Sequence, residues 1–231
     1  MKGECLITQN LSFMPYDLKW FPCSARVCVV GSTKEGTGRI AIYQLSKKEL
    51  VLKGEINSTQ PIRCVAITGH ERHIVTGDFE GVIQTWDPQQ LANPITSVKG
   101  HEGIINCLDS LNCKGEPAEI ATVSRDGNIK VWDMRQPTKA VMTISSKNNT
   151  RDIWAIAFGW VRGNKVIAVG YEDGVVQLFD VDGSQYVWEA KVKSGICSVD
   201  FDEEGNLLVS TVVGVCVIDI ESGKINHVKV K

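Results

Sequence analysis

The sequence predicts an all-β fold built from about five repeats. A turn containing glycine, followed by a run of β-branched and aromatic residues, recurs along the chain. Glycine supplies the positive φ that a tight β-hairpin needs, so each occurrence predicts two strands joined by a hairpin. Apolar runs of strand length precede these turns, whereas the 3.6-residue periodicity of a long amphipathic helix is absent.

The recurring segment has four clear copies and one shorter copy. The copies occupy residues 37–43, 80–87, 126–133, 173–180 and 214–219. The large residues that end their apolar runs, Tyr43, Trp86, Trp132, Phe179 and Ile218, are 43, 46, 47 and 39 positions apart. This period is typical of a four-stranded propeller blade and is too irregular for a heptad or leucine-rich repeat.

A further apolar strand is predicted upstream in four of the repeats, at 62–67, 104–108, 153–158 and 195–201. Short strands at even spacing favour a β-propeller. We therefore expect a single propeller domain over residues 1–231, with repeats at approximately 12–50, 58–98, 99–145, 150–190 and 191–231.

Three of the eight cysteines, Cys64, Cys107 and Cys197, fall in the upstream strands, and Trp154 holds the same place in the fourth repeat. Free cysteine is commonly buried as a small apolar residue, so we expect these thiols to be buried near the propeller axis. No Cys-x-x-Cys pair occurs, and the spacing of a zinc or thioredoxin-like site is therefore missing. The sequence predicts neither a metal nor another cofactor.

Composition points to proteins as partners. The chain has 43% hydrophobic and 23% charged residues, with 25 basic and 27 acidic side chains and a net charge of −2. It lacks the basic excess that nucleic acid or an anionic membrane attracts. The N-terminus shows no signal-peptide core, and the longest apolar run, 212–218, is far shorter than a membrane span. We expect a cytoplasmic protein.

The repeats resemble the WD-repeat family of β-propellers, most fully in the third repeat, which opens with Gly-His and closes with Trp-Asp. In that family a histidine, a strand Ser or Thr, a turn aspartate and a tryptophan form a hydrogen-bonded chain. The resemblance implies this structural tetrad for His101, Thr122, Asp126 and Trp132. Imidazole, hydroxyl, carboxylate and indole groups can satisfy one another while buried.

An ordered set of short motifs between residues 10 and 205, including 98–101, 124–127 and 131–133, resembles the dynein axonemal assembly factors of that family. The resemblance implies a non-enzymatic adaptor for the cytoplasmic assembly of axonemal dynein. Its implied partners are prefoldin-like and AAA-ATPase co-chaperone subunits, with dynein chains as clients.

Blade number departs from the family pattern. Family members have seven blades, whereas this chain has material for about five, so a truncated seven-blade ring and a divergent short form are both open interpretations. In the family an N-terminal strand completes the last blade. Residues 5–9 and residues 224–230 are therefore competing candidates for the outer strand of the fifth blade.

The hairpin between the second and third strands carries one variable residue in each of three repeats: Phe79, Arg125 and Glu172. A constant frame with one variable exposed position is how repeat proteins present binding surfaces, and aromatic residues and arginine are enriched at interfaces. We expect an exposed Phe79 beside Arg125 to contact a partner. The alternative is that these turn residues are merely solvated.

Arg135 is a separate candidate contact. It lies in a Trp-Asp-x-Arg sequence that resembles the docking motif of propellers serving as substrate receptors of cullin-4 ubiquitin ligases. The alternative is a surface arginine that follows a strand, because a four-residue motif needs structural context. No nucleophile–base or metal constellation appears beyond the repeat frame, so we predict no catalytic residues.

Overall fold

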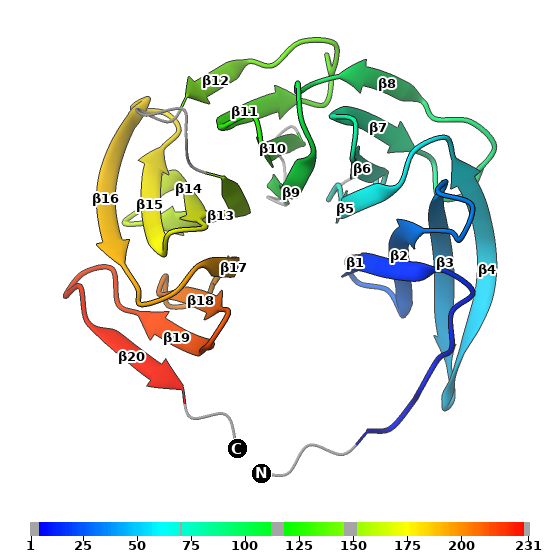
Figure 1. Cartoon of the computed structure of the whole chain (residues 1–231), viewed down its shortest axis with the longest axis horizontal. Helices are drawn as coiled ribbons and strands as arrows, with labels where there is room; N and C mark the ends of the chain where they lie inside the picture. Colours follow the sequence, from blue (N-terminus) through cyan, green and yellow to red (C-terminus); the bar gives the residue numbers. More distant parts are fainter. Residues whose placement is uncertain (1–4, 70, 112–117, 146–151, 229–231) are drawn as a thin grey trace.

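The protein is a β-propeller arc of five four-stranded antiparallel sheets. The computed structural model describes residues 5–69, 71–111, 118–145 and 152–228, and within these ranges it contains 20 strands and no helix. Figure 1 shows the sheets arranged as blades around a common axis, with the first strand of each blade innermost. The predicted all-β propeller with five blades is confirmed. No helix long and apolar enough to cross a membrane occurs in the described ranges.

Each blade consists of consecutive strands running in chain order from the axis outward. The first blade contains β1 (Met14–Trp20), β2 (Arg26–Ser32), β3 (Gly38–Ser46) and β4 (Glu49–Ser58). The second contains β5 (Ile62–Ile67), β6 (Ile74–Asp78), β7 (Val82–Trp86) and β8 (Thr96–Lys99). The third contains β9 (Ile105–Leu111), β10 (Glu119–Ser124), β11 (Asn128–Asp133) and β12 (Met142–Ser145).

The last two blades follow the same order. The fourth contains β13 (Ile153–Val161), β14 (Asn164–Tyr171), β15 (Val175–Asp180) and β16 (Gln185–Lys191). The fifth contains β17 (Ile196–Phe201), β18 (Leu207–Thr211), β19 (Gly214–Ile218) and β20 (Ile225–Val228).

One blade boundary differs from the expected one, and the structure decides between the two candidates for the last strand. The first blade ends at Ser58 rather than near residue 50, because β4 pairs with β3 along its whole length. The outer strand of the fifth blade is β20, within the C-terminal candidate, of which residues 229 and 230 lie outside the described ranges. Residues 5–9, the competing candidate, form no strand.

Apolar cores between consecutive blades hold the arc together. The large residue that ends each recurring segment packs toward the preceding blade, as Trp86, Trp132, Phe179 and Ile218 do. Neighbouring sheets approach closely: a Cβ added at Gly170 of the fourth blade would lie 2.5 Å from the Ile196 side chain of the fifth. A larger residue there would therefore push these two blades apart.

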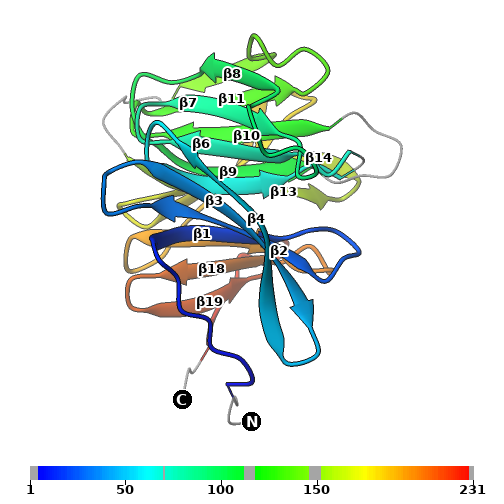
Figure 2. The same ribbon diagram turned by 90° about the vertical axis from the view of Figure 1, so that its right-hand side faces the viewer.

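The arc is open between its first and last blades. Figure 1 shows the opening between the first blade, in blue and cyan, and the fifth blade, in orange and red. In the turned view of Figure 2 the first blade lies toward the viewer, and β18 and β19 are seen beyond it. The four shared cores join consecutive blades, and among the described residues none joins the first blade to the fifth.

The four predicted tetrad residues form one hydrogen-bonded chain in the third blade. The Trp132 indole N–H donates to Thr122 Oγ1 at 2.9 Å, and Thr122 Oγ1 lies 2.8 Å from His101 Nε2. His101 Nδ1 lies 3.0 Å from Asp126 Oδ2. A neutral imidazole protonated at Nδ1 satisfies this chain, because Nε2 then accepts the Thr122 hydroxyl proton.

The surroundings of His101 and Asp126 set the charge states of these two tetrad residues. It lowers the pKa of His101, and the adjacent Asp126 carboxylate only partly offsets that effect. Burial alone would raise the pKa of Asp126, but the backbone N–H groups of Asn128 and Glu102 together with His101 outweigh it, so that pKa is lowered. The folded third blade therefore favours a neutral histidine beside an ionised aspartate.

We expect Thr122→Val to destabilise the protein by about 2 kcal/mol or more, because it leaves two buried groups, the Trp132 N–H and His101 Nε2, without their partner. Thr85→Val is the matched control: Thr85 is 4% exposed and its hydroxyl has no partner, so its removal should be neutral or stabilising. Urea unfolding of both variants measures the difference. Equal losses of stability in the two variants would contradict the expected contribution of the tetrad hydrogen bonds.

The lowered pKa of His101 predicts that the stability of the folded protein depends on pH. In the unfolded protein the pKa of histidine is about 6.5, above that of buried His101, so the unfolded state binds its proton first as the pH falls. Stability contributed by neutral His101 is present above about pH 6.5 and is lost below it.

We expect the wild-type melting temperature to fall between about pH 7.5 and 5.5, and to fall less in His101→Gln, which has no such group to protonate. His73→Gln, at a partly exposed histidine, should retain the wild-type dependence. Differential scanning calorimetry at both pH values provides the measurement. An unchanged pH dependence in His101→Gln would show that another group is responsible.

Candidate functional site

Four turn residues occupy equivalent positions at one end of the blades. In each, the backbone N–H donates to the carbonyl just before the innermost strand of the same blade: Phe79 to Pro61 at 3.1 Å, Arg125 to Ile104 at 3.0 Å, Glu172 to Asp152 at 3.1 Å and Val212 to Gly195 at 3.2 Å. The structure thus brings Phe79, Arg125 and Glu172 to one rim and adds Val212. The sequence pattern missed Val212 because the fifth copy of the segment is shortened.

The four side chains differ in exposure. The Arg125 side chain is 67% exposed, with Nε 3.7 Å from Asp152 Oδ2, and Val212 is also 67% exposed. Phe79 was expected to be exposed, but its ring packs on Tyr16 of the first blade with centroids 5.4 Å apart and is partly buried. Tyr16 is far from Phe79 in sequence, so the repeat pattern could not reveal this contact.

Every innermost strand carries a β-bulge near its start. In each blade the register to the second strand skips one residue, and the skipped residues are Tyr16, Arg63, Asn106, Trp154 and Cys197. A bulge bends the strand locally and changes the direction of a side chain. Five different side chains therefore occupy one structural position around the axis, on the same end as the four turn residues.

Four of these bulge residues, Arg63, Asn106, Trp154 and Cys197, line a hollow of about 250 Å³. The Arg63 guanidinium lies 5.8 Å from the centroid of the Tyr16 ring. Asn106 Nδ2 donates to the carbonyl of Ile153 at 2.8 Å, which ties this side chain to the fourth blade. Trp154 is 36% exposed and lines the same hollow as the cationic Arg63. This combination suits the side chains of a protein partner.

The cysteines correct part of the sequence interpretation. Cys64 and Cys107 directly follow the bulge and are buried and partly buried, respectively, whereas Cys197 is itself a bulge residue and is exposed. Trp154 is likewise a bulge residue. The sequence predicts that it shares the position of Cys64 and Cys107, but it lies one position earlier in its strand than they do in theirs. The loops between strands differ in length, so counting back from the third strand cannot locate the bulge to a single residue.

Charged side chains on the innermost strands join different blades. Asp17 Oδ2 accepts the backbone N–H of Val65 at 2.9 Å, and Asp109 Oδ2 accepts that of Phe158 at 2.9 Å. Lys19 Nζ lies 4.0 Å from Asp109 Oδ1. Burial raises the pKa of both aspartates. Among the residues with described positions, no group of three His, Cys, Asp or Glu side chains could hold a metal ion.

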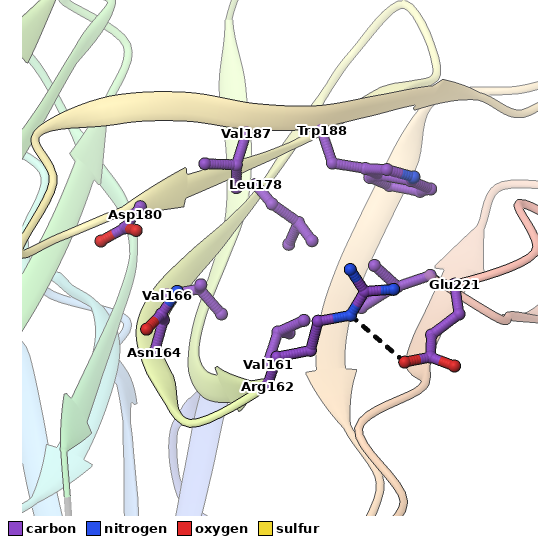
Figure 3. Close-up of a pocket in the computed structure, with 10 residues that line it drawn as sticks. Val161, Arg162, Asn164, Val166, Leu178, Asp180, Val187, Trp188 and Glu221 are labelled. Carbon is purple, nitrogen blue, oxygen red and sulfur yellow. Dashed lines mark hydrogen bonds and ion pairs between the residues drawn. The ribbon is translucent and has the colours of Figure 1, made fainter.

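A second hollow, of about 350 Å³, lies between the fourth and fifth blades at the opposite end of the strands (Figure 3). Trp188 and Leu178 form part of its apolar wall, and Arg162 crosses to Glu221 with Nε 3.3 Å from Oε1. Both charged side chains are more than 70% exposed, so this ion pair contributes at most about 1 kcal/mol.

Arg135 also lies away from the bulge residues. It follows β11, at the opposite end of the blade from Arg125, and its side chain is 69% exposed. Its guanidinium binds Asp133 through Nε, 3.0 Å from each carboxylate oxygen, and through Nη2, 2.5 Å from Oδ2. The four predicted contact residues therefore do not form one surface, since Arg135 is separated from the other three.

Cysteine labelling tests the position of the bulges. We expect iodoacetamide to modify Cys197 in the folded protein, together with exposed Cys5 and Cys23, whereas buried Cys28 and Cys64 should react only after unfolding. Burial raises the pKa of both protected thiols, so little reactive thiolate is present. Peptide mass spectrometry identifies the modified sites. Protection of Cys197 equal to that of Cys64 would contradict its position at the hollow.

Comparison with protein families supports the repeat assignment. Residues 46–87 and 92–133 match the model for the WD domain, G-beta repeat. Residues 119–204 match the model for the anaphase-promoting complex subunit 4 WD40 domain. Together these matches extend from the first blade into the fifth.

Curated relatives include proteins named dynein axonemal assembly factor 10. Identity is 38% to that of Bos taurus and 37% to that of Homo sapiens, in each case over an alignment of 219 residues that covers 89% of this chain and 61% of the relative. The Chlamydomonas reinhardtii protein is 32% identical over 206 residues, 85% of this chain and 58% of the relative. The chain thus spans about three fifths of the length of these relatives.

The resemblance of its ordered motifs to Monad, a WD-repeat dynein axonemal assembly factor, agrees with these matches. Five blades and two matching WD40 models place the chain in the WD-repeat family of β-propellers.

Proposed function

We propose that this chain is a non-enzymatic protein-binding scaffold in the cytoplasmic assembly of axonemal dynein, and that it binds partners at one end of its axis. We call this surface the mouth face. It comprises the bulge residues Tyr16, Arg63, Asn106, Trp154 and Cys197 and the turn residues Phe79, Arg125, Glu172 and Val212. The observation that carries the proposal is that a repeated bulge presents five different side chains at one place.

The chemistry of the mouth face supports a protein partner. Tryptophan, tyrosine and arginine are the side chains that most often dominate protein interfaces. Arg125 lies near Asp152, and the face also includes Arg63 and the exposed Glu172, so it is mixed in charge. Nucleic-acid binding draws its affinity from an excess of cationic groups on phosphates, which this face and the whole chain lack.

The pathway in the proposal rests on the relatives. Proteins named dynein axonemal assembly factor 10 share 32–38% identity with most of this chain. We propose dynein chains as clients, and prefoldin-like and AAA-ATPase co-chaperone subunits as associated partners.

Affinity purification with quantitative mass spectrometry tests the proposal. We expect the wild-type chain to recover dynein chains and AAA-ATPase co-chaperone subunits, and Arg63→Ala/Trp154→Ala to recover at least tenfold less. Loss of two interface anchors of about 2 kcal/mol or more each accounts for such a decrease. The matched control is Arg135→Ala/Trp160→Ala, which removes an exposed arginine and an exposed tryptophan away from the mouth face.

The outcomes separate the parts of the proposal. Failure of the wild type to recover either class would reject the pathway, and full recovery by Arg63→Ala/Trp154→Ala would reject the mouth face. If the wild type recovers the cullin-4 adaptor and Arg135→Ala/Trp160→Ala does not, the result would instead favour a role as a substrate receptor of a cullin-4 ubiquitin ligase. Thermal unfolding of both double variants confirms that the blades remain folded.

A further inference from the structure

The hollow between the fourth and fifth blades is open where the equivalent place between the second and third blades is filled. Leu178 and Trp188 pair across β15 and β16, and Thr85 and Thr96 pair in the same way across β7 and β8. Each pair lines a hollow against the following blade, of about 350 Å³ at Leu178 and Trp188 and about 10 Å³ at Thr85 and Thr96. The larger volume falls within the range of about 300–1,000 Å³ that is usual for ligand sites.

The following blade explains much of this difference. In the third blade Trp132, which ends the recurring segment, and Met134, two residues later, both line the small hollow. The fifth blade has Ile218 and Ile220 at the same two positions. Isoleucine is smaller than tryptophan and shorter than methionine, so the fifth blade reaches less far toward the blade before it.

The walls of the large hollow are apolar. Val166 and Leu178 are 2% and 1% exposed, and Trp188 and Ile220 line the hollow beside them and are partly buried. Val187, which also lines it, is the residue that the register between β15 and β16 skips, and it is 48% exposed. A large apolar side chain from outside would therefore find both aliphatic and indole contacts here.

Arg162 directs its guanidinium group into this hollow from the hairpin between β13 and β14. Val161 pairs with Asn164, and Arg162 and Gly163 between them have φ of 52° and 80°, the pattern of a tight two-residue turn. Arg162 Nε lies 3.3 Å from Glu221 Oε1, whereas its two terminal nitrogens make no hydrogen bond or ion pair with any residue of the described ranges. Figure 3 shows the guanidinium pointing toward Trp188.

The charged groups around the hollow favour a carboxylate as ligand. Among the described residues that line it, Arg162 is the one with a cationic side chain. The Asp180 carboxylate accepts the N–H of Gly183 at 2.8 Å in its own turn, and Glu221 accepts only one N–H of Arg162. A guanidinium has five N–H donors and binds a carboxylate through two of them at once. A carboxylate that enters the hollow therefore meets unused donors.

We propose that this hollow binds a segment of a protein partner in which an aspartate or glutamate stands beside a large apolar residue. The apolar side chain packs on Leu178 and Trp188, and the carboxylate binds the terminal nitrogens of Arg162. Glu221 is displaced at little cost, because both side chains of its ion pair with Arg162 are more than 70% exposed. The hollow lies at the opposite end of the strands from the mouth face, so this site is independent of binding there.

Random peptides displayed on phage provide the probe. Val187→Trp places a larger, neutral side chain at the hollow, and peptides that bind this variant are removed before selection on the wild-type chain. We expect the selected peptides to carry an acidic residue next to leucine, isoleucine, methionine or an aromatic residue. Fluorescence anisotropy then measures the dissociation constant of the most enriched peptide, and of a copy in which the matching amide replaces the acidic residue.

We expect Arg162→Gln to bind the acidic peptide at least about tenfold more weakly, because a charge-assisted bidentate pair is lost. Glu221→Gln should bind it about twofold to fivefold more tightly, because a competing exposed carboxylate is removed. Arg135→Gln, at an exposed arginine in an ion pair at the same end of the third blade, is the matched control. This control and Arg63→Ala/Trp154→Ala, at the mouth face, should both bind as the wild type does. Circular dichroism checks that each variant is folded.

Four results would overturn the proposal. If no peptide survives the removal step, the hollow binds no such segment. Basic peptides that bind Glu221→Gln more weakly and Arg162→Gln more tightly would show that the hollow takes a cation. Equal affinities of the acidic peptide and its amide copy for the wild type would show that Arg162 does not recognise the carboxylate. Loss of the peptide in Arg63→Ala/Trp154→Ala would place it on the mouth face and leave the hollow without a ligand.

Discussion

The structure depends on face-to-face packing of consecutive sheets. A four-stranded sheet with two apolar faces needs a neighbour on each, and every buried Val, Ile or Leu contributes about 1.5–3 kcal/mol only when that neighbour is present. The three inner blades obtain both neighbours from the chain itself, and the close approach of Gly170 to Ile196 shows how tightly their faces fit. The two end blades obtain one neighbour each. The same constraint therefore explains the buried faces in the middle of the arc and the exposed Leu18 and Trp20 of the first blade.

The β-bulge links this packing to the mouth face. By inserting one residue, the bulge interrupts the strict alternation of faces, so that one side chain per blade is excluded from the interblade cores. Ile62, Ile105, Ile153 and Ile196 directly precede the bulges and are completely buried, whereas the next residue in each blade is partly or largely exposed. Because packing does not constrain the bulge residue, it varies freely, and Arg63, Asn106, Trp154 and Cys197 share one position without harm to the fold.

The sequence predicted the blades well because their cues are local. Glycine turns and the large residues that end each segment located the hairpins, and the tetrad motif placed Trp132 and His101. The bulge residues were not recognised, because the loops before them differ in length and a one-residue shift moves a side chain to the other face. Val212 was missed for a related reason, since its repeat is shorter. Contacts between blades, such as Tyr16 with Phe79, depend on how the arc curves, which local patterns do not encode.

The side of the fifth blade that faces away from the fourth is more polar than the corresponding side of the fourth blade. On this side Ser198 pairs with Ser210, where the fourth blade has Ala155 opposite Gly170. The two serine hydroxyls lie 2.6 Å apart and satisfy each other, so the face tolerates water better than its internal counterpart. Asp200 likewise stands where the fourth blade has Ala157. Covering these groups costs desolvation that an all-apolar face avoids. Ser198, Ser210 and Asp200 therefore make this side of the fifth blade chemically different from the apolar faces that form the four internal interfaces.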